Sequence, residues 1–177
     1  DPLRFLRFNQ EQEYGKEATD VLKRIISEQK DGIGLAINKT EMSYGRYVGV
    51  LVGDNGKNIN LEVLRQGAAS GLPWGNTDLI GKREVLAAEG EAKKANAGMW
   101  ALSRYRAVDL YNKLTGQRQT YNTLSRLDKL AERPELAAYA TYLDSLKGQT
   151  GPLTEEQQAK VSQLASAYQS ASEEFKQ

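Results

Sequence analysis

The sequence predicts an α+β fold in two parts, a mixed helix-and-strand domain over residues 1–101 and an all-helical extension over residues 102–177. Two short segments rich in β-branched and aromatic residues, 32–37 and 47–52, lie between helical patterns in the first part. After Trp100 the apolar residues keep a helical spacing only. The hydrophobic content of 40% suffices for a core of ordinary size in a chain of 177 residues.

An amphipathic helix is expected near the start of the chain. Its apolar residues recur at intervals that place them on one stripe of a helix. They are Ala18, Val21, Leu22, Ile25 and Ile26. Before this helix, residues 4–8 alternate arginine with phenylalanine in the manner of a half-buried strand.

The two strand segments are expected to pair in antiparallel fashion, with residues 38–46 as a polar connection. Residues 54–57, Asp-Asn-Gly-Lys, indicate a turn after the second strand, because asparagine and glycine accept a positive φ at low cost. A short helix over residues 61–66 follows and ends at Gly67.

A loop and a longer helix complete the first part. Residues 71–76 contain glycine and proline and indicate the loop. The helix is expected over residues 82–95, ending before Gly98, with Trp100 just beyond it in the core. Its inward side is expected to carry Val85, Leu86, Ala88, Ala92 and Ala95.

The extension is expected to contain three to four helices. Apolar spacing indicates helices over residues 102–114 and 120–131, and Pro134 opens another that runs to Leu146. The Gly- and Pro-containing residues 148–152 interrupt the helical pattern.

The last helix has a marked start. Thr154 and Gln157 have the spacing of a capping box. The apolar residues that follow recur at intervals of three and four; they are Val161, Leu164, Tyr168, Ala171 and Phe175. This pattern is too short to establish a coiled coil, so a helix packed on its own domain is favoured.

The composition excludes several kinds of chemistry. The chain has no histidine and no cysteine, which removes histidine general bases, serine-histidine hydrolysis, thiolate catalysis, disulfides and most zinc sites. With 24 basic and 23 acidic residues the formal charge is +1, so binding of nucleic acid would need a local basic patch.

The sequence does not indicate a compartment. Its composition is that of a soluble globular chain, and no run reaches the ~20 apolar residues that span a bilayer. Residues 1–4 have neither the basic region nor the apolar stretch of a signal peptide. No membrane contact is expected.

Three stretches, taken in order, carry a resemblance to a known family. They are Tyr-Gly-Lys-Glu-Ala at residues 14–18, Tyr-Gly-Arg at 44–46 leading to Arg-Gln-Gly at 65–67, and Glu-Gly-Glu-Ala-Lys-Lys at 89–94 leading to Gly-Met-Trp at 98–100. This part of the chain resembles the staphylococcal nuclease family. The resemblance implies a partial OB-type (staphylococcal-nuclease-like) β-barrel with packed helices, and it does not extend beyond Trp100.

The resemblance also implies a site. Active members are expected to use arginines, acids and a calcium ion, and Arg4 and Arg65 match the arginines that would bind phosphate. However, Asn9 and Gln12 occupy the positions of the first acid and of the general-base glutamate. An amide supplies no countercharge to a metal and cannot accept a proton near neutral pH.

Two neighbouring acids, Glu11 and Glu13, are possible substitutes if the register slips. Trp74 lies near where related enzymes stack a base, which would assist nucleic-acid binding, although an aromatic residue that anchors a loop is commoner. For Arg65, a surface ion pair with Glu62 is as well supported as a phosphate contact.

The family's barrel begins with a two-stranded hairpin that also supplies a calcium ligand, and nothing before Arg4 corresponds to it. The missing strands are expected from another chain, from the helical extension, or from a longer polypeptide of which this is a fragment. A protein partner or additional chain segment is therefore expected, within a multi-subunit assembly.

The favoured hypothesis is a non-catalytic nuclease-like module that serves as a structural, protein-binding or nucleic-acid-binding component of a larger assembly, for example a virion. No cofactor is then expected. The alternative is an active calcium-dependent phosphodiesterase that cleaves DNA or RNA, with Glu11 or Glu13 as its base.

Overall fold

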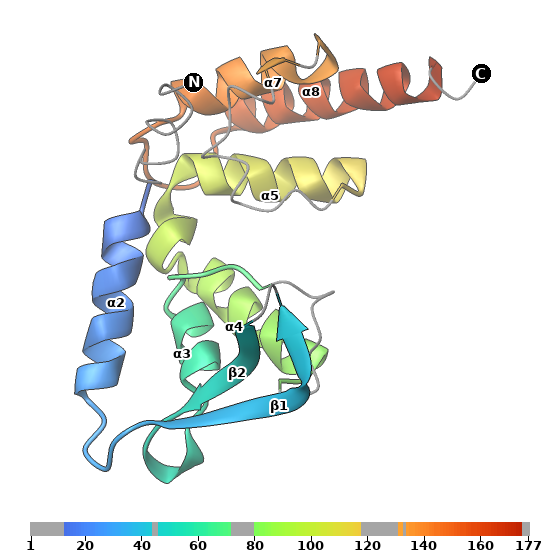
Figure 1. Cartoon of the computed structure of the whole chain (residues 1–177). Helices are drawn as coiled ribbons and strands as arrows, with labels where there is room; N and C mark the ends of the chain where they lie inside the picture. The colour runs from blue at the N-terminus through green and yellow to red at the C-terminus, as the bar shows by residue number, and fades with distance from the viewer. Residues whose placement is uncertain (1–12, 44–45, 72–79, 118–130, 133, 175–177) are drawn as a thin grey trace, which may run out of the picture. The chain divides into compact units, whose positions relative to one another are not determined.

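The computed structural model describes residues 13–43, 46–71, 80–117, 131–132 and 134–174. Contacts divide the chain into two compact units, which are treated separately below. One unit is continuous, Tyr14–Met99, and the other is assembled from Asp1–Glu13 and Trp100–Gln177. Taken together, the described elements of the two units are largely helical, with one two-stranded antiparallel sheet (Figure 1).

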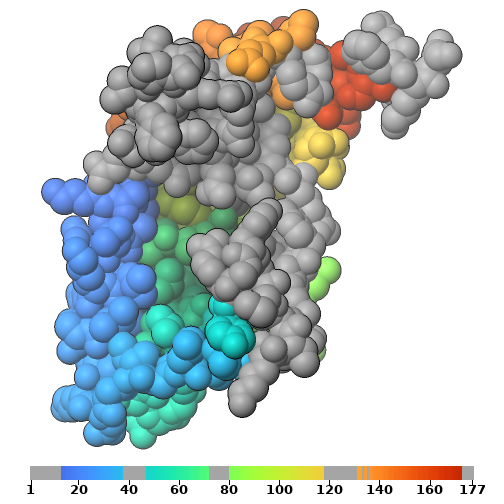
Figure 2. Space-filling view, viewed as in Figure 1, coloured from blue at the N-terminus to red at the C-terminus, as the bar shows by residue number. Residues whose placement is uncertain are grey.

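The unit Tyr14–Met99 begins with helix α2, Gly15–Ser27. It follows Tyr14, whose φ of 70° is left-handed, and its apolar stripe is the one that the spacing predicts. Ile25 is only 1% exposed and lies in the core, whereas Ile26 at the edge of the stripe is 36% exposed. Charged residues of α2, among them Lys16, Asp20 and Lys23, are exposed. Figure 2 shows this helix, in blue, at the surface of the molecule.

The sheet consists of β1, Gly34–Ser43, and β2, Arg46–Val52, paired antiparallel. The predicted polar connection over residues 38–46 is wrong, because β1 continues to Ser43. After an irregularity between Ile37 and Met42 the ladder resumes opposite Tyr47 and Arg46. Backbone pairing, which needs no apolar side chains, extends this strand beyond its apolar part.

One face of the sheet exposes apolar side chains. Leu35 lies opposite Leu51, and Tyr47 lies four residues before Leu51 on the same strand. Because side chains alternate between faces, Leu35 and Tyr47 share a face. They are 63% and 62% exposed, while Val50 on the other face is 5% exposed.

Two helices follow the sheet. The predicted turn is a single 3-10 turn, Asp54–Gly56. Helix α3 spans Ile59–Arg65 and begins two residues before the start that the apolar pattern indicates. Asn58 caps α3 by accepting a hydrogen bond from the amide of Leu61. This cap gives a hydrogen-bond partner to an amide of the first turn that has none inside the helix, and it fixes where the helix begins.

Helix α4 spans Lys82–Ala95, as predicted. Val85 and Ala88 pack with Leu64 of α3 in the core of this unit. The expected inward positions of Leu86 and Ala95 are wrong, since the side chain of Leu86 is 50% exposed and Ala95 is exposed as well. Glu89, by contrast, is buried on this helix. Its carboxylate pairs with Lys93 at 2.6 Å and accepts a hydrogen bond from the amide of Gly71 at 2.7 Å.

A close backbone crossing ends the unit. The amide of Met99 donates to the carbonyl of Gly67 at 2.9 Å. Gly67 has a φ of 66°, and a Cβ atom there would lie 2.1 Å from the carbonyl oxygen of Ala97. Only glycine fits both the left-handed conformation and this approach.

A short 3-10 turn, Gly98–Ala101, contains the last residues of one unit and the first of the next. The other unit contains helices α5, Ser103–Thr115, α7, Pro134–Ser145, and α8, Glu155–Glu174. These three helices are confirmed where the sequence predicts them, and the helix expected over residues 120–131 falls almost entirely outside the described residues. Trp100 is 2% exposed, as expected for a core residue.

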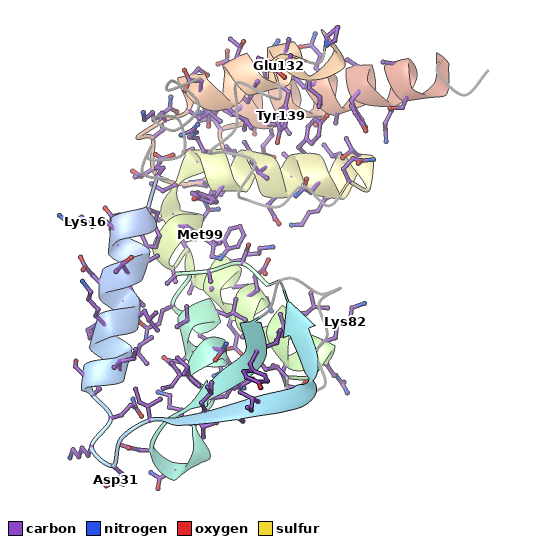
Figure 3. The ribbon with its side chains drawn as sticks, viewed as in Figure 1. Lys16, Asp31, Lys82, Met99, Glu132 and Tyr139 are labelled. Atoms are coloured by element: carbon purple, nitrogen blue, oxygen red, sulfur yellow. The ribbon has the colours of Figure 1, made fainter. Side chains whose placement is uncertain are left out.

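Aromatic packing holds these helices together. The rings of Tyr111 on α5 and Tyr139 on α7 stack with centroids 3.9 Å apart. Figure 3 labels Tyr139 among the side chains of these helices. Tyr168 of α8 adds a tilted contact to Tyr111 at 6.1 Å. Burial raises the pKa of Tyr139 well above its usual value, so this ring stays neutral.

The start of α8 confirms the predicted capping box. The hydroxyl of Thr154 accepts from the amide of Gln157 at 3.2 Å, and the Gln157 side chain accepts from the amide of Thr154 at 2.9 Å. In the part of the chain that the structure describes, no helix combines the length and apolarity that a membrane crossing requires.

Candidate functional site

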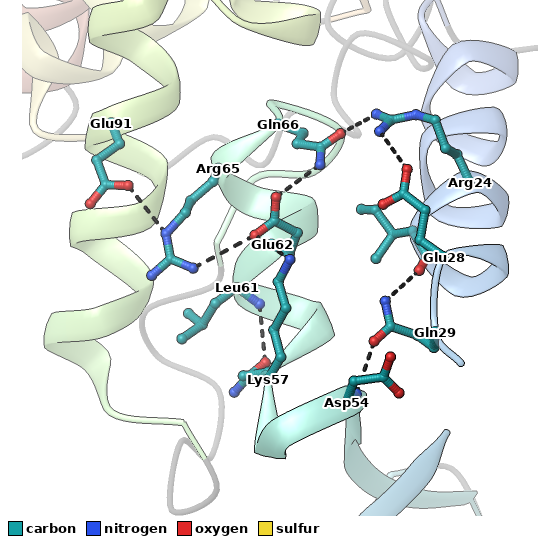
Figure 4. A network of polar contacts seen from close by, with 12 residues as sticks. Arg24, Glu28, Gln29, Asp54, Lys57, Leu61, Glu62, Arg65, Gln66 and Glu91 are labelled. Atoms are coloured by element: carbon teal, nitrogen blue, oxygen red, sulfur yellow. Dashed lines mark hydrogen bonds and ion pairs between the residues drawn. The ribbon is translucent and has the colours of Figure 1, made fainter. Parts of the chain in front are cut away.

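Arg65, the arginine matched by the family resemblance, lies in the last turn of α3. Its Nε atom is 3.2 Å from a carboxylate oxygen of Glu91 on α4 (Figure 4). Its Nη1 atom is 4.0 Å from Glu62, one turn earlier on α3. The side chain is 43% exposed, so the guanidinium is reachable from solvent but already has two acidic neighbours.

Glu62 is the centre of these contacts. It accepts a hydrogen bond from the side-chain amide of Gln66 at 2.9 Å and pairs with Lys57 at 3.3 Å. The Gln66 bond is the main cause of a lowered pKa at Glu62, with Lys57 and Arg65 adding to it. Glu62 is therefore held as a carboxylate.

The network continues to helix α2. Gln66 accepts a hydrogen bond from Arg24, which also pairs with Glu28 at 3.4 Å. Beyond it, Asp54 accepts hydrogen bonds from the amides of Lys30 and Asp31 at 2.8 and 3.0 Å. These backbone donors, Lys30 first, lower the pKa of Asp54.

Cations and carboxylates alternate along this network. We call it the Arg65 network, and its charged members are Arg24, Lys57, Arg65, Glu28, Glu62 and Glu91. Their formal charges cancel. Among the residues that the structure describes, Arg65 is therefore surrounded by a balanced set of charges and not by the kind of basic patch that gathers polyanions.

Glu13, the possible substitute base, lies in the other unit. One of its carboxylate oxygens is 3.0 Å from Nη1 of Arg104, and the other accepts from the amide of Gly148 at 2.8 Å. Its main-chain carbonyl accepts from the hydroxyl of Tyr105 at 2.8 Å. Each oxygen of this carboxylate thus has a donor from the same unit, residues 1–13 and 100–177.

The remaining candidate site residues fall outside the described residues. They are Arg4, Asn9, Glu11, Gln12 and Trp74. Their roles stay predictions from the sequence.

The described residues do not fit a calcium site. No group of three or more acids that could hold a metal occurs among them. Glu13, the candidate nearest in sequence to the matched acid positions, has both oxygens engaged by protein donors. A hard divalent ion needs several free oxygen ligands, which this arrangement does not offer.

Sequence reasoning named Glu62 as a partner of Arg65 and missed Glu91 and Arg104. Spacing of three along a helix indicates the first pair. Glu91 is 26 residues from Arg65, and Arg104 is 91 residues from Glu13. The sequence carries no local signal for contacts at such separations.

Comparisons with known proteins agree with this fold. The family model described as "Staphylococcal nuclease homologue" matches residues 3–102, more than half of the chain. The chain therefore belongs to the staphylococcal nuclease family. It is also similar to the protein named Endonuclease YhcR of Bacillus subtilis (strain 168), with 33% identity over 89 residues. That match covers 49% of this chain and 7% of the relative, so this chain spans only a small part of that protein.

Proposed function

We propose that this chain is a non-catalytic member of its family that acts as a structural or binding component of a larger assembly. The main observation behind this proposal is the set of contacts that the Glu13 carboxylate makes. Its carboxylate is paired with Arg104 and accepts from the amide of Gly148, so its charge is compensated and each of its oxygens already has a protein donor. The family-matched acid positions nearby carry the amides Asn9 and Gln12.

The surroundings of Arg65 support the same proposal. A guanidinium that clamps a phosphate in a transition state needs its donors free and its charge uncompensated. Glu62 and Glu91 compensate that charge here. The neutral Arg65 network is better suited to a protein contact than to a polyanion.

The sheet supports a protein partner. Leu35 and Tyr47 expose apolar surface on one face, and β1 and β2 pair only with each other as strands of the described sheet. A partial OB-type barrel completed by strands from another chain or chain segment would cover both features. A partner in a multi-subunit assembly would then bind through backbone hydrogen bonds and this apolar face.

A cleavage assay tests the catalytic part of the proposal. The chain is incubated with single-stranded DNA and with RNA, in calcium and in excess chelator. We expect equal, background cleavage in both conditions, because the matched acid positions carry the amides Asn9 and Gln12 and because Glu13 is paired with Arg104. Calcium-dependent cleavage that disappears in Arg65→Ala would overturn the proposal. Arg83→Ala, at another exposed arginine of the same unit, is the matched control.

A retention assay tests the kind of partner. In a gel-shift experiment with labelled single-stranded DNA, we expect weak binding that salt abolishes, since the formal charge is +1. Tight binding that Arg65→Ala removes, and that Arg83→Ala leaves, would identify nucleic acid as the partner instead.

An active calcium-dependent nuclease is the second candidate. It is favoured by the family itself and by the relative whose name is an endonuclease. In that case Glu11 would be the remaining candidate base close to the matched positions. Loss of the calcium-dependent cleavage in Glu11→Gln, with Glu17→Gln as control, would support this candidate.

A further inference from the structure

Helix α4 has exposed cations that form no ion pair in the part of the chain that the structure describes. They are Lys82, Arg83 and Lys94. Lys82, at the start of the helix, is labelled in Figure 3. An external carboxylate can therefore pair with any of these three side chains without displacing an acid of the protein.

Most acids of the same helix are already compensated. The carboxylate of Glu89 pairs with Lys93 at 2.6 Å, and that of Glu91 lies 3.2 Å from Nε of Arg65. The remaining acid, Glu84, lies in the first turn, where the positive end of the helix dipole stabilises it. The exposed surface of α4 thus keeps more unpaired positive charge than unpaired negative charge.

Two of the unpaired cations lie at opposite ends of one side of α4. Residues 83, 87, 90 and 94 follow at spacings of four, three and four, which places them on one side of a helix. Leu86, next to this row, is 50% exposed, and Ala87 is exposed as well. A Cβ atom added at Gly90 would meet nothing within 4 Å. We call this surface the α4 outer face, and its members are Lys82, Arg83, Leu86, Ala87, Gly90 and Lys94.

The charges of the α4 outer face match a partner helix better than a polyanion. Arg83 and Lys94 are eleven residues apart, which is roughly 16 Å along a helix. The affinity of nucleic acid grows with the number of phosphates that are neutralised, and three cations offer few such contacts. Exposed Leu86 lies between the cations and suits an apolar side chain that is flanked by acids. The open space at Gly90 allows a second helix to come close.

We propose that the α4 outer face is a docking surface for an acidic amphipathic helix of a partner protein. Carboxylates eleven positions apart on the partner helix pair with Arg83 and Lys94, and an apolar side chain between them packs against Leu86. This inference rests on the proposed function, because it assumes a protein partner. It deepens that function by naming the surface and the chemistry of the partner. All members of the surface belong to the unit Tyr14–Met99.

Fluorescence anisotropy of two labelled peptides with the full chain tests the proposal. The acidic peptide is a designed helix with two glutamates eleven positions apart and leucines along the side between them. The neutral peptide has glutamine in place of both glutamates. The protein variants are Arg83→Gln, Lys94→Gln and the double variant. Lys16→Gln is the matched control, because Lys16 is another exposed lysine of the same unit.

We expect the acidic peptide to bind the original chain about 2- to 25-fold more tightly than the neutral peptide at low salt. This range follows from two exposed charge pairs that contribute about 1.4- to 5-fold each. Arg83→Gln and Lys94→Gln should each lose one of these factors. The double variant should bind both peptides alike, and Lys16→Gln should behave as the original chain.

Two further variants test the apolar part of the surface. Gly90→Gln should retain the fold, because its Cβ meets no other atom and glutamine favours a helix more than glycine does. Its side chain fills the space that the partner helix needs, so both peptides should bind more weakly. Leu86→Gln should also weaken both peptides, since it removes the apolar contact. The thermal midpoint of each variant shows whether it is folded.

Several results would contradict the docking surface. They are equal binding of the two peptides, no detectable binding of either, and an equal loss in Lys16→Gln. Single-stranded DNA that binds more tightly than the acidic peptide, and that weakens in Arg83→Gln and Lys94→Gln, would assign the surface to nucleic acid instead. Cleavage is measured separately on the original chain. Calcium-dependent activity would therefore contradict the non-catalytic role without deciding the docking surface.

Discussion

Nε of Arg65 on α3 lies 3.2 Å from a carboxylate oxygen of Glu91 on α4. The two side chains are 43% and 61% exposed, so solvent screens their attraction. An exposed pair of this kind contributes about 0.2–1 kcal/mol. Glu91 therefore neutralises Arg65 without burying it, and a competing anion could take its place at a small cost.

Removal of the Glu91 carboxylate should strengthen any binding of phosphate at Arg65. We predict that Glu91→Gln raises the affinity for single-stranded DNA by about 1.4- to 5-fold, whatever its starting value, because the competing carboxylate is lost. Fluorescence anisotropy at low salt measures the change. Glu84→Gln, an acid in the first turn of α4, controls for net charge. An equal rise in both variants would show that only the net charge acts.

Acid should destabilise the unit Tyr14–Met99. The pKa of Asp54 is lowered by the amides of Lys30 and Asp31, and that of Glu62 is lowered chiefly by Gln66. Groups with a lowered folded-state pKa contribute stability above their unfolded values, and that stability is lost as pH falls through the folded pKa. The unfolded values are near 3.8 and 4.5.

We therefore predict that the urea midpoint of this unit falls as the pH drops below the unfolded value of Glu62. In Glu62→Gln the dependence on pH should be shallower, since one of the two groups no longer titrates. Lys57→Gln keeps both acids and should retain most of the slope. A slope that is identical in Glu62→Gln would contradict the role of Glu62.

Gly67 should not tolerate a side chain. Its φ is 66°, and an added Cβ would meet the carbonyl oxygen of Ala97 at 2.1 Å. We predict that Gly67→Ala destabilises the unit by more than the roughly 1–2 kcal/mol that a left-handed alanine costs alone. Gly56→Ala is a matched control, since Gly56 has a φ of 74° and open space around it. Equal thermal shifts in the two variants would show that the crossing can relax.

The exposed face of the sheet should bind a hydrophobic dye. Leu35 and Tyr47 share this face and are each more than half exposed. We predict that the double substitution Leu35→Thr and Tyr47→Thr lowers the fluorescence of bound ANS, because less apolar surface remains. Leu86→Gln removes a single exposed apolar side chain on α4 and should change the signal little. A larger effect of Leu86→Gln would place the dye elsewhere.

Local patterns predicted most of the helices. The bounds of α4, Lys82–Ala95, and the cap at Thr154 follow from residues that are neighbours in the sequence. The family resemblance likewise rests on short runs of residues. Such signals act within one or two turns of a helix, where the sequence itself contains both partners.

The features that the local patterns did not predict depend on tertiary contacts. The extension of β1 to Ser43 depends on pairing with Arg46, and the burial of Glu89 depends on Lys93 and on Gly71. An apolar pattern cannot reveal a strand that is held by its backbone or a buried acid that is paired. The same applies to Arg104, whose partner lies 91 residues away.

Glu13 leaves the ribosome long before its partners do. Arg104 follows 91 residues later and Gly148 follows 135 residues later. At translation rates of about 5–20 residues per second, the carboxylate waits roughly 7–27 s for its last ligand. The residues between 14 and 99 are all synthesised within that interval, so the inserted unit can form first. Biosynthesis thereby makes full binding of the Glu13 carboxylate a late event, and a nascent chain that is interrupted before Gly148 retains an incompletely bound acid.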